Sequence, residues 1–273
     1  MKKYKAQRKD GVPILPGEAI IPIVNELEEG KLQVIGTGFY ITRYGLFATA
    51  KHVFEKIIDT KKGRKQRWFV PHLGPEDKIY LRRIKGISYS LSCDIAIGQA
   101  DNYCDKYPND PLMNLIPTLS TRVPNIGDDV CTYAYPENKL INFIDKTANK
   151  EIVSNYYEGK FLKHTFPPEN PKYKHPYYET TIHVKNGASG GPVFHNGKIV
   201  GLNSSGLDYL AEDGTIKGHS FIIPIAELMN VETKLDYIPN TSFEYRQIPE
   251  NKRMGITKII ELVIYNHVMF SNE

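Results

Sequence analysis

The feature that most constrains the fold is a long series of short apolar segments separated by glycine and proline. The segments are rich in β-branched and aromatic residues. Such a series predicts many short β-strands and therefore an all-β barrel or sandwich. Helical periodicity is scarce, so we expect only a short helix after His52 and another near Ile225 in this part of the chain. The predicted strands span 19–24, 32–41, 45–50, 78–83, 94–98, 129–135, 151–157, 180–184, 192–194, 198–203 and 220–224.

The chain divides into two predicted lobes with a short segment at each end. The stretch 109–127 is interrupted by prolines and shows little periodicity, which suits a crossing between two β lobes. In the last segment, apolar residues at helical spacing over 256–264 favour an amphipathic helix, although their β-branched side chains also permit a strand. The expected N-terminal segment, first lobe, second lobe and C-terminal extension span 1–17, 18–118, 119–235 and 236–273.

The charge and hydropathy patterns argue against two classes of partner. The net charge of +4 and the pI of about 8.7 are only mildly basic, whereas nucleic-acid-binding domains concentrate basic residues on one face. We expect the densest basic run, 61–67, to form a solvated loop. No window of the sequence is long and apolar enough to predict a membrane span. Neither nucleic acid nor a membrane is therefore expected as a partner.

The cysteines and the N-terminal sequence predict a cytoplasmic protein. The basic start is followed by an apolar stretch that several prolines interrupt, which does not resemble a secretory signal. Cys93, Cys104 and Cys131 cannot all pair with one another, and none lies in a CxxC motif. We expect reduced and buried thiols, with a zinc site that combines them with a histidine as the weaker alternative. No metal and no cofactor is expected.

A glycine-rich run at 186–193 predicts a nucleophilic serine. It reads Asn-Gly-Ala-Ser-Gly-Gly-Pro-Val and places Ser189 between glycines. Because glycine lets the backbone turn sharply, the serine hydroxyl and two backbone N–H groups can point at one place, where an oxyanion would form. Such a loop needs a base and an orienting acid from elsewhere in the chain.

Two residues have the surroundings that this base and acid require. A serine is a poor nucleophile at neutral pH without a base within hydrogen-bond reach, which is usually histidine. His52 follows two strand-like segments and a small-residue turn, which would hold it rigidly at a strand end. Asp94 is embedded among small and apolar residues, where burial of its charge is costly without a partner. His52 would be that partner, held in one tautomer by the carboxylate.

Three short motifs in the order His, Asp, Ser carry a family resemblance. Thr-Ala-x-His-Val ends at Val53, Asp-Ile-Ala begins at Asp94, and Gly-x-Ser-Gly-Gly-Pro-Val begins at Gly187. Together they resemble the chymotrypsin-like (trypsin-like) serine peptidases, and most closely the intracellular, HtrA-type branch. The segments Gly-Thr-Gly-Phe-Tyr-Ile at 36–41 and Ser-Phe-Ile-Ile-Pro-Ile at 220–225 resemble further parts of the same family.

The resemblance implies a fold and a set of roles. The fold would be an all-β, chymotrypsin-like double barrel: two six-stranded antiparallel Greek-key barrels with a short C-terminal helical extension. His52 would be the general base, Asp94 its orienter and Ser189 the nucleophile. The backbone N–H groups of Gly187 and Ser189 would form the oxyanion hole. The resemblance covers about residues 18–232, and too few residues follow for the PDZ domain of HtrA-type relatives.

By the same resemblance, a pocket beside Ser189 receives the P1 side chain, on the N-terminal side of the scissile bond. Its floor would be His183, and no acidic floor residue is present. Asn203 and His183 could hydrogen-bond a polar or acidic P1 group, or His183 could be a packed strand residue, so the P1 preference stays open. The residues expected to line the pocket are His183, Asn203, Ser204, Ser205 and Gly206.

The sequence thus predicts a serine endopeptidase that cleaves peptide bonds through an acyl-enzyme. The alternative is a catalytically silent module that binds a peptide or an effector on the same fold. The expected partners are protein or peptide substrates, and the segment 236–273 is a candidate contact for a regulatory partner protein or a second copy of the chain. The stretch 161–178, rich in proline and lysine, is the candidate switch segment.

Overall fold

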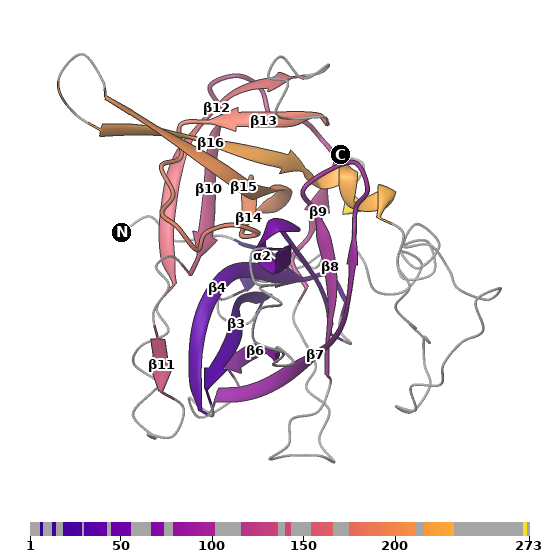
Figure 1. Ribbon diagram of the computed structural model, residues 1–273. Helices are drawn as coiled ribbons and strands as arrows, with labels where there is room; N and C mark the ends of the chain where they lie inside the picture. Colours follow the sequence, from indigo (N-terminus) through magenta and orange to yellow (C-terminus); the bar gives the residue numbers. More distant parts are fainter. Residues whose placement is uncertain are drawn as a thin grey trace.

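The computed structural model is dominated by β-strands, with only short helical turns among the described residues (Figure 1). The described residues are 6–7, 13–14, 19–28, 30–42, 45–55, 67–73, 79–101, 116–135, 140–142, 154–165, 175–210, 214, 216–231 and 270–271. The elements are β1 (Ala6–Gln7), β2 (Pro13–Ile14), β3 (Ile20–Glu28), β4 (Lys31–Tyr40), β5 (Leu46–Thr49), α2 (His52–Glu55), β6 (Trp68–Leu73), β7 (Ile79–Tyr89), β8 (Ala96–Ala100), β9 (Leu119–Ser120), β10 (Asp129–Ala134), β11 (Leu140–Asn142), β12 (Asn155–Thr165), β13 (Tyr177–Thr180), β14 (Pro192–His195), β15 (Lys198–Leu210), β16 (Ile216–Pro224), the 3₁₀ helix η4 (Ile225–Asn230) and β17 (Phe270–Ser271).

Six strands of the N-terminal half close into an antiparallel barrel, drawn in indigo and purple in Figure 1. Their order is β4-β3-β6-β7-β8-β5, and β5 pairs back with β4. β5 and β8 are buried on both faces, which explains why their sequences are almost continuously apolar or small. β11 pairs with β4 at the outside of this barrel, although it follows the first strand of the second barrel in sequence.

A second antiparallel barrel follows, drawn in pink and orange above the first in Figure 1. Its order is β14-β10-β12-β13-β16-β15, and β14 pairs back with β15. Buried and less buried residues alternate along β10, as expected for a strand with one face toward a barrel interior. The short strand β9 adds to β15 in parallel, and β17 adds to β9 in parallel.

The two barrels share one topology. When the six strands of each barrel are numbered in chain order, both barrels close in the order 2-1-4-5-6-3. The fourth strand returns to lie beside the first, which is the Greek-key connection. The prediction of two six-stranded antiparallel barrels is confirmed.

The hydrophobic core consists of two clusters. The smaller one fills the second barrel and consists of Val130, Phe161, Tyr178, Ile182, Val193, Val200 and Ile222. The larger one fills the first barrel and continues through Tyr135, Phe194 and Leu202 of the second half. The same apolar cluster therefore packs the barrels against each other, which fixes the position of any side chain at their junction.

One predicted strand is displaced in the structure. We expected a strand over 180–184, but β13 ends at Thr180 and the following residues are irregular. The fully buried side chain of Ile182 gives this segment its apolar signal, although the segment forms no ladder. Its backbone is held by single bonds instead, among them the hydroxyl of Ser220, which donates to the carbonyl of Ile182 at 2.6 Å.

Several predictions fall outside the described residues. The helix expected at 256–264, Cys104 and the basic residues 61–66 are among them. Of the C-terminal extension, the structure describes only β17, which is a strand. The predicted domain boundaries stay predictions.

Two glycines on β15 provide a matched test of packing in the second barrel. A Cβ at Gly201 would lie 2.6 Å from the carbonyl oxygen of Ile223, whereas a Cβ at Gly206 would meet nothing closer than 3.6 Å. Overpacking against backbone forces a shift that costs about 1–3 kcal/mol. Gly201→Ala should lower the free energy of unfolding by about 1–3 kcal/mol, and Gly206→Ala should change it by less than about 0.5 kcal/mol. Chemical denaturation measures both, and equal losses would contradict this packing.

Candidate active site

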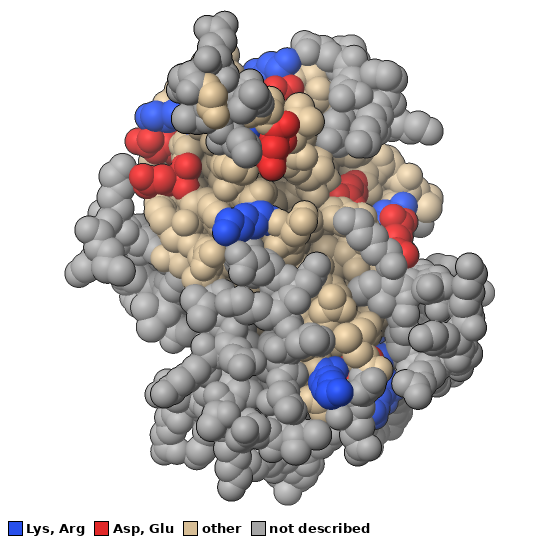
Figure 2. Space-filling view, turned by 60° about the vertical axis from the view of Figure 1, so that its left-hand side comes forward, with Lys and Arg blue, Asp and Glu red and all other residues tan. Residues whose placement is uncertain are grey.

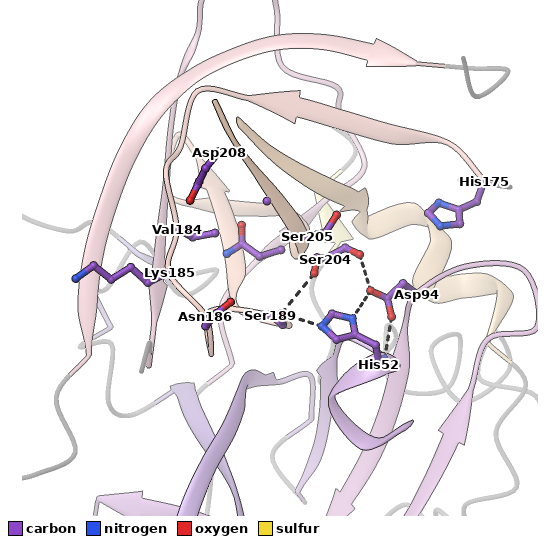
Figure 3. A pocket seen from close by; sticks show the side chains of 12 residues that line it. His52, Asp94, His175, Val184, Lys185, Asn186, Ser189, Ser204, Ser205 and Asp208 are labelled. Carbon is purple, nitrogen blue, oxygen red and sulfur yellow. Dashed lines mark hydrogen bonds and ion pairs between the residues drawn. The ribbon is translucent and has the colours of Figure 1, made fainter. Parts of the chain in front are cut away.

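Three connections bring one side chain each to the junction of the barrels (Figure 3). His52 begins α2 shortly after β5, and Asp94 lies between β7 and β8. Ser189 lies between β13 and β14. The first two residues belong to the first barrel and the third to the second barrel, so packing of the barrels is needed to bring them together.

The three side chains form a hydrogen-bonded row. Oδ2 of Asp94 lies 2.7 Å from Nδ1 of His52, and Oδ1 accepts the backbone N–H of His52 at 2.9 Å. Nε2 of His52 lies 2.8 Å from Oγ of Ser189. Because an ionised carboxylate can only accept, Nδ1 of the neutral imidazole carries the proton. Nε2 is then the acceptor for the hydroxyl of Ser189.

Ser204 completes the surroundings of Asp94. Its hydroxyl donates to Oδ2 of Asp94 at 2.5 Å, and the side chain of Asp94 is only 20% exposed. Burial by itself raises the pKa of Asp94. The hydrogen bonds and charge attraction of His52, with the bond from Ser204, outweigh this effect and hold the pKa below its ordinary value of 3.8. The carboxylate is therefore ionised at neutral pH.

The loop that carries Ser189 lies directly against β4. Gly190 has a φ of +83°, and a Cβ there would lie 2.2 Å from the carbonyl oxygen of Thr37. Thr37 donates its backbone N–H to the carbonyl of Ser189 at 2.9 Å and its hydroxyl to the carbonyl of Gly187 at 3.0 Å. Only glycine combines this φ with the absence of a Cβ, so the glycine after the serine has a direct structural cause.

A tight turn precedes the serine. Ala188 donates its backbone N–H to the carbonyl of Lys185 at 3.1 Å, and Gly187, the third residue of the turn, has a φ of +93°. This combination is typical of a type II turn. Within the described part of the chain, the backbone N–H groups of Gly187 and Ser189 have no acceptor. Both donors are therefore free to bind an incoming group beside the hydroxyl of Ser189.

A cavity of about 590 Å³ opens beside the row. Asn203 lies in its lining and is almost completely buried. Asp208, near the C-terminal end of β15, contributes a carboxylate to the wall of this cavity (Figure 3). The lining residues are His52, Asp94, His175, Val184, Lys185, Asn186, Ser189, Asn203, Ser204, Ser205, Gly206 and Asp208.

His183, which we expected at the floor, is not among these lining residues. Its ring packs over Gly218, where a Cβ would lie 2.5 Å from it, and its Nε2 lies 3.0 Å from Oδ1 of Asp208. This contact is half exposed and keeps the imidazole outside the cavity, so Asp208 rather than His183 contributes to the lining.

The sequence matches the trypsin-like peptidase domain over residues 36–202, which is more than half of the chain. The chain belongs to the trypsin-like peptidase family. It is thus a serine peptidase and a hydrolase, as the sequence motifs predicted. No curated protein sequence matches it.

Solved structures support the same fold for this trypsin-like peptidase. The crystal structure of Deg5 superposes with a TM-score of 0.54 at 17% identity, and the match covers 78% of this chain and 86% of that one. The MamO protease domain from Magnetospirillum magneticum gives a TM-score of 0.52 at 12% identity, over 78% of this chain and 94% of that one. At such identities the likeness shows the shared fold.

Sequence reasoning missed two features of the peptidase site. The bond from Ser204 to Asp94 joins residues 110 positions apart, and no local pattern marks it. Asp208 could have been found, since it lies two residues after Gly206 on one strand, and residues two apart point to the same side. The sequence also gave no signal that His175, Val184, Lys185 and Asn186 would line the cavity.

Other features of the described residues concern alternative functions. None of their helices is long and apolar enough to cross a membrane, and no cluster of three or more metal-ligating side chains occurs among them. Cys93 and Cys131 are free thiols, and burial raises the pKa of each to about 11. Such thiols stay protonated at neutral pH and are poor nucleophiles and metal ligands.

On the face in Figure 2, described basic and acidic side chains are interspersed, so the described residues form no purely basic patch on this face.

The depressed pKa of Asp94 makes a pH-dependent contribution to stability. Because the pKa is lower in the folded protein, this contribution is fully present above the unfolded value near 3.8 and is lost as the pH falls through the folded value. Asp94→Asn lacks this titration. The difference in free energy of unfolding between native protein and variant should therefore shrink as the pH falls below 3.8. Urea denaturation over a pH series measures this difference in the free energy of unfolding. A difference that does not change with pH would contradict a lowered pKa of Asp94 in the folded protein.

Proposed function

We propose that the peptidase cleaves peptide bonds through an acyl-enzyme on Ser189, with His52 as general base and Asp94 as its orienting acid. The observation that carries this proposal is the 2.8 Å separation between Nε2 of His52 and Oγ of Ser189. At this distance a proton passes directly between the two atoms. Protein or peptide substrates follow from the family.

Acylation begins when Oγ of Ser189 bonds to the substrate carbonyl carbon while its proton moves to Nε2 of His52. Negative charge develops on the carbonyl oxygen, where the backbone N–H groups of Gly187 and Ser189 can stabilise it. Asp94 stabilises the imidazolium that forms. His52 then gives its proton to the leaving amine as the carbon–nitrogen bond breaks, which leaves the acyl group on Ser189.

Deacylation repeats these steps with water as the nucleophile. His52 takes one proton from the water as its oxygen bonds to the acyl carbon, and the same two backbone N–H groups hold the second oxyanion. The proton returns to Oγ of Ser189 as the ester bond breaks. The products are a carboxylic acid and the regenerated hydroxyl.

Cytoplasmic location and a regulatory partner or second copy at the C-terminal segment belong to the same proposal. Free Cys93 and Cys131 support a reducing compartment, because disulfides accumulate in oxidising ones. Residues 232–269 lie outside the described part of the chain, so the contact through this segment stays a prediction.

An active-site probe tests the nucleophile directly. A fluorophosphonate should label native protein at Ser189 because His52 raises the nucleophilicity of its hydroxyl. Ser189→Ala should give no labelling, and His52→Ala should slow labelling by about 10⁴-fold or more. Ser92→Ala, which removes an exposed hydroxyl away from the cavity, should label at the native rate. Mass spectrometry identifies the labelled peptide, and equal labelling of Ser189→Ala would contradict the proposal.

A survey of new protein termini separates the peptidase from a silent binding module. Cells that express native protein should contain peptide termini that are absent from cells with Ser189→Ala, because only cleavage creates them. A binding module would give the same termini in both. The comparison is made by enrichment and mass spectrometry of N-terminal peptides at equal expression levels.

A further inference from the structure

A buried acceptor without a partner lies at the cavity beside Ser189. Asn203 lines this cavity and is 1% exposed, and its side-chain oxygen Oδ1 accepts no hydrogen bond in the described structure. A buried acceptor of this kind has lost its hydrogen bonds to water without replacing them. Buried polar atoms without a hydrogen-bond partner are rare in native proteins, so this one indicates a role beyond packing.

The orientation of this amide is fixed by Thr132. The hydroxyl of Thr132 is fully buried and donates its single hydrogen to the carbonyl of Pro192 at 2.7 Å. The same Oγ1 can then only accept, and it accepts from Nδ2 of Asn203 at 2.8 Å. A flipped amide would set its oxygen against the lone pairs of Thr132. The nitrogen of the amide therefore points to Thr132, and the oxygen is left without a partner.

The backbone of Asn203 places this amide next to the serine loop. Its carbonyl accepts the N–H of Gly190 at 2.7 Å, and its N–H donates to the carbonyl of Gly191 at 2.8 Å. These two bonds tie Asn203 to the residues that directly follow Ser189. An acyl group on Ser189 would thus have Asn203, which lines the cavity, close to its first side chain.

The surrounding wall adds a second acceptor. The carboxylate of Asp208 lines the same cavity, and its known partner is His183 outside it. The side chain of Lys185 points away from the other labelled residues in Figure 3, and His175 lies beyond Asp94 on the far side. A carboxylate that entered beside Asn203 would therefore face Oδ1 of Asn203 and the carboxylate of Asp208, which can only accept, whereas an N–H group could donate to them.

We propose that Asn203 is a specificity-determining residue and that the peptidase selects substrates whose P1 side chain ends in an N–H donor, an amide or an ammonium group. This inference rests on the proposed function, because the cavity binds a P1 side chain only if Ser189 is the nucleophile. Oδ1 of Asn203 receives the donor, and Thr132 is the positioning residue that presents it. An acidic P1 side chain, which the sequence had left open, is rejected.

Fluorogenic peptides test the preference in native protein. Mixtures with P1 fixed as Gln, Lys, Glu or Met and the other positions randomised are compared by kcat/KM. Gln and Glu have the same shape, and Met matches Gln without a donor. We expect the Gln mixture to be cleaved about tenfold to a hundredfold faster than the Met and Glu mixtures, which corresponds to one buried hydrogen bond. Because an ammonium group donates as well, we expect the Lys mixture also to be cleaved at least about tenfold faster than the Met mixture.

Two variants assign the preference to the amide. Asn203→Leu removes the acceptor and should bring the Gln to Met ratio to about one. Thr132→Val releases the amide to rotate, so the Gln to Glu ratio should fall by about tenfold. Each ratio is taken within one variant, so a general loss of activity or stability cancels. A purely structural role of either residue would leave the ratios unchanged.

The outcomes separate the two proposals. If native protein is labelled by the fluorophosphonate and cleaves peptides, but cleaves after Glu as fast as after Gln, the specificity proposal is overturned while the catalytic one stands. Ratios that do not change in Asn203→Leu and Thr132→Val overturn it as well. If native protein is neither labelled nor active on any mixture, the catalytic proposal fails and the specificity proposal falls with it.

Discussion

The geometry of the site is set by the close approach of the Ser189 loop to β4. At Gly190 no room remains for a Cβ, and Thr37 bonds the loop through its N–H to the carbonyl of Ser189 and through its hydroxyl to the carbonyl of Gly187. The carbonyl of Thr37 also accepts the hydroxyl of Thr49 at 2.7 Å, near the end of the strand that leads to His52. Thr37 thus holds both the loop that carries Ser189 and the strand that leads to His52.

The site exists because each barrel supplies what the other lacks. The first barrel presents His52 and Asp94, and the second presents Ser189 and Ser204. Ser204 bonds back to Asp94, so the row is closed from both sides of the junction. The apolar cluster that spans the junction packs the two barrels against each other and so holds the members of the row in place. The packed barrels therefore hold Asp94, His52 and Ser189 in their hydrogen-bonded row before a substrate binds.

The sequence predicted those features of the fold and the site that depend on residues close together in the chain. Short apolar segments and turn residues predicted an all-β barrel or sandwich, and the family resemblance implied the double barrel. The glycines near Ser189 predicted a sharp backbone turn, which has positive φ at Gly187 and Gly190. Features that depend on pairing across the chain were missed, such as β11 on β4. The segment 180–184 was wrongly assigned to a strand because Ile182, which is buried without belonging to a strand, gives the segment an apolar pattern typical of a strand. His183, expected at the floor of the pocket, does not line the cavity, because it contacts Asp208 from a different segment and no local pattern encodes this contact.

The most direct test of the central claim is to trap the acyl group. Native protein mixed with an ester substrate is quenched in acid during turnover, digested and analysed by mass spectrometry. If Ser189 is the nucleophile, the mass of the acyl group appears on the peptide that contains Ser189, and Ser189→Ala forms neither adduct nor product. Product release at an undiminished rate by Ser189→Ala, with no acylated peptide from native protein, would contradict it.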